Sequence, residues 1–477
     1  MARLDELKYA GEFRIDECTI ITHEGFEYNI SSLIEAVNFY EDIYSATVSG
    51  SIIVKDTTNI VMNFPIIGQE RLLLKIQTPQ TNPTRETSID FTTMPLYIYK
   101  INMQEGLNEG SQVISLEFAS SEGLRNQTSR ISQSYSGQPS EIVEKILRDE
   151  SYLKSKKELI VEPTANNVKV VFPNYKPFKC IRHLLNISNS AVANSSPSYL
   201  FYETAAGFNF RTFDGLCKEP VKFFFRENVA SVLNEKKVID VQLNLETIVS
   251  YQIVTSKDTY KNLQNGMISS KLIEHDIYNK RLDLYKYDYL SNFDTDIHPD
   301  EGGSPIIAAA EDLETLKPIT DSDAKLYVSS TASGYSFSEG SNYPYQSDNR
   351  NQTLQRKKSR KIQFESGVAL NVEVPGQTAI HAGDKIRLEI GATSSIVQKD
   401  EDTDLTGNYI ITQLRHTFNQ SGDAKHSIVM RVAKDSKQGN SYGNSIQRQP
   451  SHTITSSATN SVTKSTDSEY YSNTTAI

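Results

Sequence analysis

GQERLLLKI (Gly68–Ile76) and GDKIRLEI (Gly383–Ile390) are two stretches of the chain that share one pattern. In each, a glycine precedes a run with apolar residues at every second position, which is typical of a β-strand with one buried face. The aligned apolar residues are Leu72, Leu74 and Ile76 in the first stretch, and Ile386, Leu388 and Ile390 in the second. Their offset is 390 − 76 = 314 residues. Each glycine is expected to open the turn before its strand.

The strands that follow these two stretches keep nearly the same offset. PLYIYKINM (95–103) and GNYIITQLRH (407–416) are both rich in Tyr and Ile, and they match within one residue of that offset. The next pair aligns Ile114, Leu116 and Phe118 with Ile428, Met430 and Val432, and 428 − 114 = 314. Three successive strands in one register indicate an internal repeat. The sequence therefore predicts a mainly β fold with α+β insertions, containing two similar antiparallel β-barrels per chain.

The remaining segments divide the chain around these two barrels. At 477 residues, more than one domain is expected. Helical spacing in GQPSEIVEKILRDE and KPFKCIRHLLNIS, with an aromatic hairpin in YLFYETAAGFNFRTF, predicts a small α+β domain. The predicted parts are a first β-barrel at 1–130, the α+β domain at 131–236, a second β-barrel at 237–265 and 361–435, a mixed insertion at 266–360, and a Ser/Thr-rich C-terminal extension at 436–477.

Composition and charge exclude several classes of protein. A net charge of −10 argues against extensive gripping of nucleic acid, which needs clustered Lys and Arg. No apolar stretch approaches the roughly 20 residues that cross a bilayer, so membrane insertion is not expected. The N-terminus lacks a signal peptide's apolar segment, so the chain is expected to be made in the cytoplasm. Cys18, Cys180 and Cys217 are scattered and are expected to be core residues.

Candidate metal sites in the sequence are weak. Asp400, Asp402 and Asp404 alternate as a calcium loop would begin, but Leu405 and Ile411 occupy the positions that need Gly and Glu. A second acidic segment, FDTDIHPDEGG, carries Asp294, Asp296, His298 and Asp300. The eight histidines, none paired at ligand spacing on one helix, are His23, His183, His275, His298, His381, His416, His426 and His452. The sequence predicts no metal-binding residues and no cofactor.

Familiar catalytic motifs are also absent from the sequence. There is no phosphate-binding glycine loop, no GxSxG and no HExxH. Glu41 and Asp42 are adjacent carboxylates, but neighbours on a strand point to opposite faces. The sequence therefore predicts no catalytic residues and a chain that is not an enzyme.

One basic run, QRKKSRK (Gln355–Lys361), precedes a predicted strand. We expect it to be a solvated helix end. The alternative is a contact with an acidic neighbour in an assembly.

Taken in order, several segments resemble one family, the central baseplate hub subunit of T-even-type contractile-tailed bacteriophages. The segments are NFYEDIYSATVSGSIIVKD followed by FPIIGQERLLLKI, then SYLFYETAAGFNFRTFDGL, NGMISSKLIEHDIYNKRLDLYKYDY, LNVEVPG, HAGDKIRLEI and LTGNYIITQLRHTF. They span roughly Phe13 to Asp435. The resemblance implies two hub β-barrels per chain and three chains in a pseudo-sixfold ring.

The same resemblance implies a function and a set of partners. A homotrimer of this kind adapts the sixfold tail tube to the threefold central spike and leaves a channel for genome ejection. The implied neighbours are tail tube proteins, the central spike protein and baseplate wedge proteins, while tape-measure protein and genomic DNA pass through the lumen without specific binding. The implied location is the tail baseplate of the virion, assembled in the host cytoplasm.

Two other functions stay open on the sequence. The hub-like part of a type VI secretion or other contractile-injection spike shares the double barrel, but it would predict an oligonucleotide-fold domain and a β-helical needle after Asp435, where the sequence is rich in Ser and Thr. A cell-wall-degrading tail enzyme would need a cleft with catalytic carboxylates.

Overall fold

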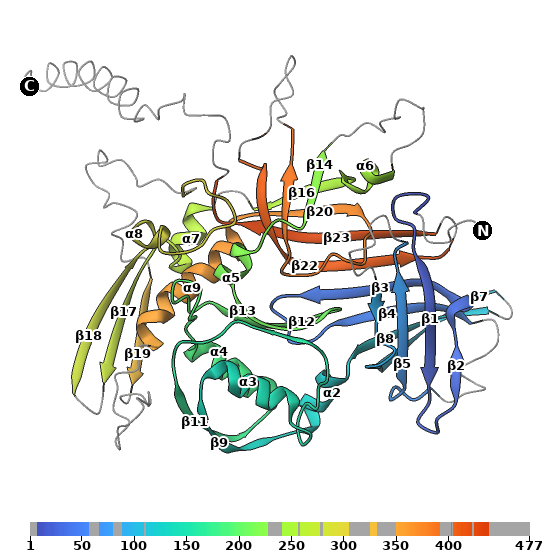
Figure 1. The fold of residues 1–477 in the computed structure, drawn as a ribbon, viewed down its shortest axis with the longest axis horizontal. Coiled ribbons are helices and arrows are strands. Elements are labelled where there is room, and N and C mark those ends of the chain that lie inside the picture. Colours follow the sequence, from blue (N-terminus) through green and yellow to red (C-terminus); the bar gives the residue numbers. More distant parts are fainter. Residues whose placement is uncertain are drawn as a thin grey trace, which may run out of the picture. The chain divides into compact units, whose positions relative to one another are not determined.

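A computed structural model describes residues 7–56, 66–79, 88–108, 111–227, 241–255, 258–276, 280–304, 325–331, 350–391, 402, 404–421 and 424–437 of the chain. Within these ranges the fold is mainly β, and fifteen strands belong to one hydrogen-bonded sheet. That sheet has two parts, one made of strands between residues 14 and 120 and the other of strands within residues 223–255 and 368–434 (Figure 1). Each part packs against a core of its own. The predicted C-terminal extension lies outside the described residues from residue 438 onward.

The first part of the sheet, here called unit 1, consists of the strands between residues 14 and 120. They are β1 (Arg14–Ile21), β2 (Glu27–Asn29), β3 (Ile34–Asp42), β4 (Ser49–Asp56), β5 (Arg71–Gln77), β6 (Ser88–Asp90), β7 (Leu96–Asn108) and β8 (Ser111–Ser120), with the short helix η1 (Ser31–Leu33). In β5, every second residue from Leu72 to Ile76 is buried, as the alternation predicts. These residues pack with Phe39, Phe91 and Phe118 in one core.

The second segment, unit 2, combines strands from the later part of the chain. They are β14 (Phe223–Glu227), β15 (Thr247–Ile248), β16 (Ser250–Thr255), β20 (Val368–Pro375), β21 (Lys385–Glu389), β22 (Gly407–Asn419) and β23 (Lys425–Lys434), with helix α6 (Val241–Leu245). Its core contains Ile386 and Leu388 of β21 with Tyr409, Met430 and Val432. Gly68 and Gly383 have φ values of +83° and +90°, so both predicted turn glycines occupy the left-handed region that favours glycine.

Strand pairing repeats between the two units residue by residue. In unit 1, β7 pairs with β8 so that Ile98 faces Phe118, and a bulge at Tyr99 follows. In unit 2, β22 pairs with β23 so that Ile411 faces Val432, and a bulge at Thr412 follows. The offsets are 411 − 98 = 313 and 432 − 118 = 314, in agreement with the sequence prediction. A shared bulge at one register is a feature of related strands and supports the repeat.

The two units differ at their margins. β1 pairs antiparallel with β5, whereas β14 pairs parallel with the corresponding strand β21. The tight β3–β4 connection of unit 1 corresponds to the β16–β20 connection of unit 2, which carries the predicted insertion. The mainly β class is confirmed, but the described strands form an open sheet that closes neither unit into a barrel.

An α+β region follows unit 1. It contains α2 (Ser121–Thr128), β9 (Ile131–Gly137), α3 (Pro139–Arg148), β10 (Leu159–Val161), β11 (Val168–Tyr175), α4 (Pro177–Ile187), β12 (Tyr199–Thr204), β13 (Gly207–Thr212) and α5 (Phe213–Lys218). α3 starts with proline, whose missing N–H costs nothing at that position, and buries Ile142, Val143 and Ile146 as predicted. β12 and β13 form the predicted hairpin.

The insertion within unit 2 has a small sheet and a long helix. Its elements are α7 (Thr259–Asn265), β17 (Ser269–Asp276), β18 (Arg281–Asp288), α8 (Tyr289–Phe293), β19 (Leu326–Thr331) and α9 (Arg350–Ser366). β17 pairs antiparallel with β18 and parallel with β19. Helix α9 runs through the boundary predicted between residues 360 and 361. Among the described residues, no helix combines the length and the apolar character that crossing a membrane requires.

Candidate functional site: the unit junction and buried ionic clusters

The junction between the two units is a strand ladder. β22 pairs antiparallel with β3 from Gln413 opposite Asp42 to Asn419 opposite Ala36 (Figure 1). Arg415 donates to the side-chain oxygen of Asn38 at 2.8 Å, which fixes one polar pair across the ladder. The backbone hydrogen bonds thus pass without interruption from unit 2 into unit 1.

A histidine pair lies buried beside this ladder. His416 of β22 faces Phe39 of β3, and its Nδ1 lies 3.0 Å from Nε2 of His426 on β23. Both imidazoles are fully buried. Burial lowers the pKa of His416 to about 4 and lowers that of His426 well below its usual value. The pair is therefore neutral at pH 7, with one ring donating to the other.

This pair predicts a pH dependence of stability. The folded pKa of His416 is depressed, so its contribution is present above the unfolded pKa of about 6.5 and is lost as the pH falls toward 4. Between pH 7 and pH 5 this costs about 2 kcal/mol. We expect His416→Leu to remove that part of the pH dependence in urea unfolding followed by tyrosine fluorescence. The exposed His23→Leu is the control, and equal pH dependence in wild type and His416→Leu would refute the assignment.

Glu41 connects three parts of the structure. Its carboxylate accepts backbone hydrogen bonds from Ala205 (2.7 Å) in the β12–β13 turn and Ala382 (2.8 Å) before β21, and Nδ1 of His381 lies 3.2 Å away. Burial opposes ionisation, but His381 and the hydrogen bonds to the carboxylate together lower the pKa of Glu41. Asp42 instead accepts from the side chain of Gln413 at 2.9 Å. The adjacent carboxylates therefore have separate partners, and both of these contacts are structural.

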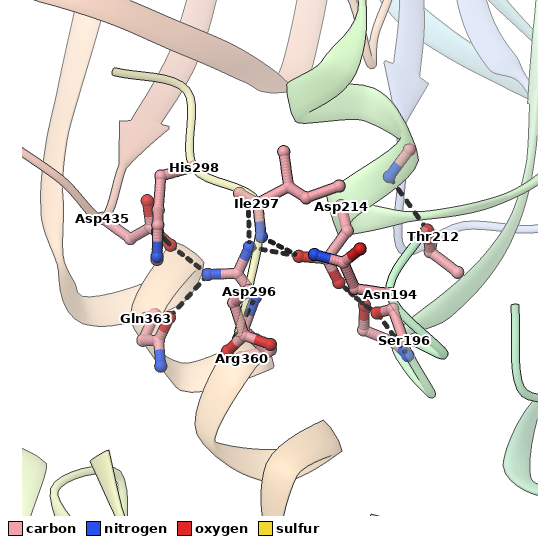
Figure 2. Close-up of polar contacts among 12 residues, drawn as sticks. Asn194, Ser196, Thr212, Asp214, Asp296, Ile297, His298, Arg360, Gln363 and Asp435 are labelled. Atoms are coloured by element: carbon pink, nitrogen blue, oxygen red, sulfur yellow. Dashed lines mark hydrogen bonds and ion pairs between the residues drawn. The ribbon is translucent and has the colours of Figure 1, made fainter. Parts of the chain in front are cut away.

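A second cluster surrounds Arg360 of α9, whose side chain is fully buried (Figure 2). Its guanidinium donates to Asp214 of α5 at 2.9 Å and also to Asp435 after β23. Further donations reach the Ile297 carbonyl at 2.7 Å and Gln363 at 2.8 Å. The cluster thus ties α9 to the α+β region, to the segment after α8 and to the end of unit 2.

The charges of this cluster are balanced. Asp296 pairs with Arg356 at 2.7 Å, and Nδ1 of His298 lies 2.9 Å from Asp435. The other ring nitrogen of His298 lies 2.8 Å from the carbonyl of Phe293, so both nitrogens face acceptors. Burial opposes protonation, but Asp435 outweighs it and raises the pKa of His298. Three cations, Arg356, Arg360 and protonated His298, therefore face three aspartates.

These contacts correct the expectation for the basic run Gln355–Lys361. The run lies inside α9, not at a solvated helix end, and Gln355, Ser359 and Arg360 are buried. The acidic partners of its arginines, Asp214, Asp296 and Asp435, belong to the same chain. A helix that packs on one side against the protein buries the residues that face inward. A charged residue is stable in such a buried position only when it pairs with an opposite charge.

A third cluster connects unit 1 to the α+β region. Nζ of Lys157 lies 2.8 Å from Glu122 of α2 and also bonds Glu203 of β12, and all three side chains are buried. Glu203 accepts a hydrogen bond from the backbone of Val48 at 3.1 Å. Burial raises the pKa of Glu203 to about 7, whereas Lys157 outweighs burial at Glu122 and lowers its pKa to about 2. One lysine thus holds two carboxylates at this contact.

The acidic segments considered for metals have other roles. Asp402 accepts backbone hydrogen bonds from Asp404 (2.9 Å) and Leu405 (3.0 Å), as in a capped turn, and Asp400 lies outside the described residues. Asp294 is exposed, and Asp300 accepts from the backbone of Asn408 at 2.9 Å. No group of three or more His, Cys, Asp or Glu in the described part of the chain is arranged to hold a metal ion.

The remaining histidines and the cysteines are dispersed. His183 packs edge-on against Phe172, and His275 is exposed on β17. His452 lies outside the described residues. Cys18, Cys180 and Cys217 are all free and buried, which confirms their prediction as core residues.

Comparison with solved structures identifies proteins that share this fold. A scan against protein-family models found no match, and a search of curated proteins found none. Among solved structures, a tail protein from Neisseria meningitidis matches with a TM-score of 0.50 and 12% identity, over 88% of this chain and 96% of that one. A 43 kDa tail protein of prophage MuSo2 from Shewanella oneidensis matches with a TM-score of 0.50 and 8% identity, over 88% and 99%. This chain has the fold of these tail proteins.

Proposed function

We propose that the chain is a structural component of a contractile phage tail, and within it the central hub of the baseplate. The observation that carries this proposal is the internal repeat, in which two units with matching strand registers are joined by the β22–β3 ladder. The likeness in fold to a tail protein and to a prophage tail protein supports the same assignment. In this proposal, each unit corresponds to one hub barrel.

The repeat suits a protein placed between partners of different symmetry. Three chains with two related units each offer six similar surfaces, so a trimer can meet a sixfold tail tube on one side and a threefold spike on the other. The proposed neighbours are tail tube, spike and wedge proteins of the baseplate. The proposed lumen lets tape-measure protein and DNA pass without specific binding, as suits a net charge of −10.

In this proposal the chain acts by docking and conduction and has no enzymatic activity. The ionic clusters around Glu41, Lys157 and Arg360 support it, since their groups hold elements of the fold together. Release of peptidoglycan fragments by the purified chain would favour a cell-wall-degrading enzyme instead.

Electron microscopy of the purified chain tests the proposal. We expect end-on views of a ring with six similar lobes, threefold symmetry and a central opening. Imposing sixfold symmetry should preserve the lobes but blur the segments specific to one unit, such as the insertion at 266–360. Particles without a central opening, or with another number of lobes, would refute the hub assignment.

A further inference from the structure

The outer edge of β7 has backbone groups without a ladder partner among the described residues. β5 pairs with β7 at Tyr97 and Leu96, and from Lys100 to Asn108 the described partner of β7 is β8. In unit 2 the corresponding edge of β22 is occupied, because β22 pairs there with β3 of unit 1. Among its described residues, unit 1 therefore leaves open the edge that unit 2 uses to join its neighbour.

β16 has a second open edge among the described residues. β16 pairs with β20, and its other edge has no ladder in the described part of the chain. In unit 1 the corresponding edge of β3 is occupied by β22. The β16 sequence, SYQIVT, has no charge, Pro or Gly, and Ile253 and Val254 are 47% and 39% exposed. β16 has a bulge at Val254 but lacks the charges and prolines with which soluble proteins usually protect such an edge, so we expect a partner strand there.

The repeat defines which residues of the two open edges correspond to the occupied ones. Through their partners on β8 and β23, Met103 and Gln104 of β7 correspond to His416 and Thr417 of β22. Through β4 and β20, Gln252 and Ile253 of β16 correspond to Asn38 and Phe39 of β3. The observed pairs are His416 with Phe39 and Thr417 with Asn38.

We propose that β7 of one chain pairs antiparallel with β16 of a second copy, in the register of the β22–β3 ladder. Met103 then faces Ile253 of the neighbouring chain, and Gln104 faces its Gln252. The residue types suit this register, because Thr417 and Asn38 at the occupied junction are also a polar pair, 3.4 Å apart. The occupant is a second copy because this chain already contains both halves of the same junction.

This inference rests on the proposed ring and adds its mechanism of closure. Each chain offers one β7 edge and one β16 edge, so the contact is head-to-tail, and such contacts form a ring when the rotation between neighbours closes. Three junctions within chains and three between chains would alternate around a ring of six units. The sheet would then continue through the ring, and no open edge of this kind would remain.

Cysteine cross-linking tests the proposed register. We expect the double variant Gln104→Cys with Gln252→Cys to form disulfide-linked dimers and trimers under mild oxidation, because cysteines directly opposite on paired strands can bond. The matched control is Gln104→Cys with Ile253→Cys. It shifts one cysteine by one residue and so places the two side chains on opposite faces. The native cysteines are buried and remain in both variants.

The outcomes separate this inference from the proposed function. Trimers that cross-link at least tenfold more in the first variant than in the control support the ladder and its register. Trimers that cross-link in neither variant, or equally in both, overturn the ladder and leave the ring standing. A chain that stays monomeric under all conditions overturns both the ladder and the ring. The same result would be seen if a strand of another protein occupied the open edge.

A surface variant gives a second readout that needs no cysteine. Ile253→Lys places a charge on the β16 edge, and we expect at least a tenfold weaker association of chains in analytical ultracentrifugation. Val429→Lys is the control, because Val429 is 41% exposed on β23, a strand paired on both sides. Equal association of the two variants would overturn the pairing.

Discussion

Replacing Arg360 with methionine is expected to lower the free energy of unfolding by about 3–5 kcal/mol, the usual cost of removing one partner from a buried ion pair. Arg360 is fully buried and contacts Asp214 and Asp435, with Asp296 at 3.6 Å. Methionine fills much of the volume of the arginine side chain. The three aspartates then face only two cations, Arg356 and His298. Urea unfolding of purified Arg360→Met against wild type measures the loss.

A neighbouring residue gives the matched control. Lys361→Met removes the same charge from the next position of α9, where the side chain is 55% exposed, and we expect a change within about 0.5 kcal/mol. Adding Asp214→Asn to Arg360→Met should recover part of the lost stability, since Asp214 is then the one carboxylate of the cluster that has lost its cation. A stable Arg360→Met variant, or one that Asp214→Asn weakens further, would contradict the role given to the cluster.

The second large effect is expected at Lys157. Lys157→Met leaves Glu122 and Glu203 buried without their cation, so the free energy of unfolding at pH 7.5 should fall by about 3–5 kcal/mol. Both carboxyls then have folded pKa values above their unfolded ones. Their contribution is therefore more favourable at low pH and is lost as the pH rises. The deficit against wild type should shrink between pH 7.5 and pH 5, as urea unfolding at the two pH values will measure.

The control for this prediction is Lys156→Met, which removes an exposed lysine next in sequence. Its effect should stay within about 0.5 kcal/mol at both pH values. A Lys157→Met deficit that is the same at pH 5 and pH 7.5 would show that the loss comes from packing and not from the two carboxylates.

The repeat was predictable from sequence because strand burial follows period two. Leu72, Leu74 and Ile76 had to face a core, and the same rule applied to their counterparts 314 residues later. The structure adds the shared bulge and the ladder between β22 and β3, which depend on contacts between distant strands. The direction of β14 was not predictable, since the alternation of buried residues is the same in parallel and antiparallel strands.

The ionic clusters were missed for a related reason. Arg360 stands in a basic run that usually faces solvent, and its partners Asp214, Asp296 and Asp435 come from three other parts of the chain. Local sequence carries no signal of such a meeting. The histidine pair left a weak signal in the sequence, because His416 and His426 occupy inward positions of two predicted neighbouring strands. Two polar residues on buried faces of adjacent strands can be expected to pair.

In the proposed assembly, three copies of this chain form one ring of six related units. Light scattering of the purified chain at micromolar concentration measures the mass of the assembly directly. We expect three times the chain mass of 53.6 kDa, and the same value over a range of concentrations. A stable monomer, or an assembly whose mass is not a multiple of three chains, would contradict it.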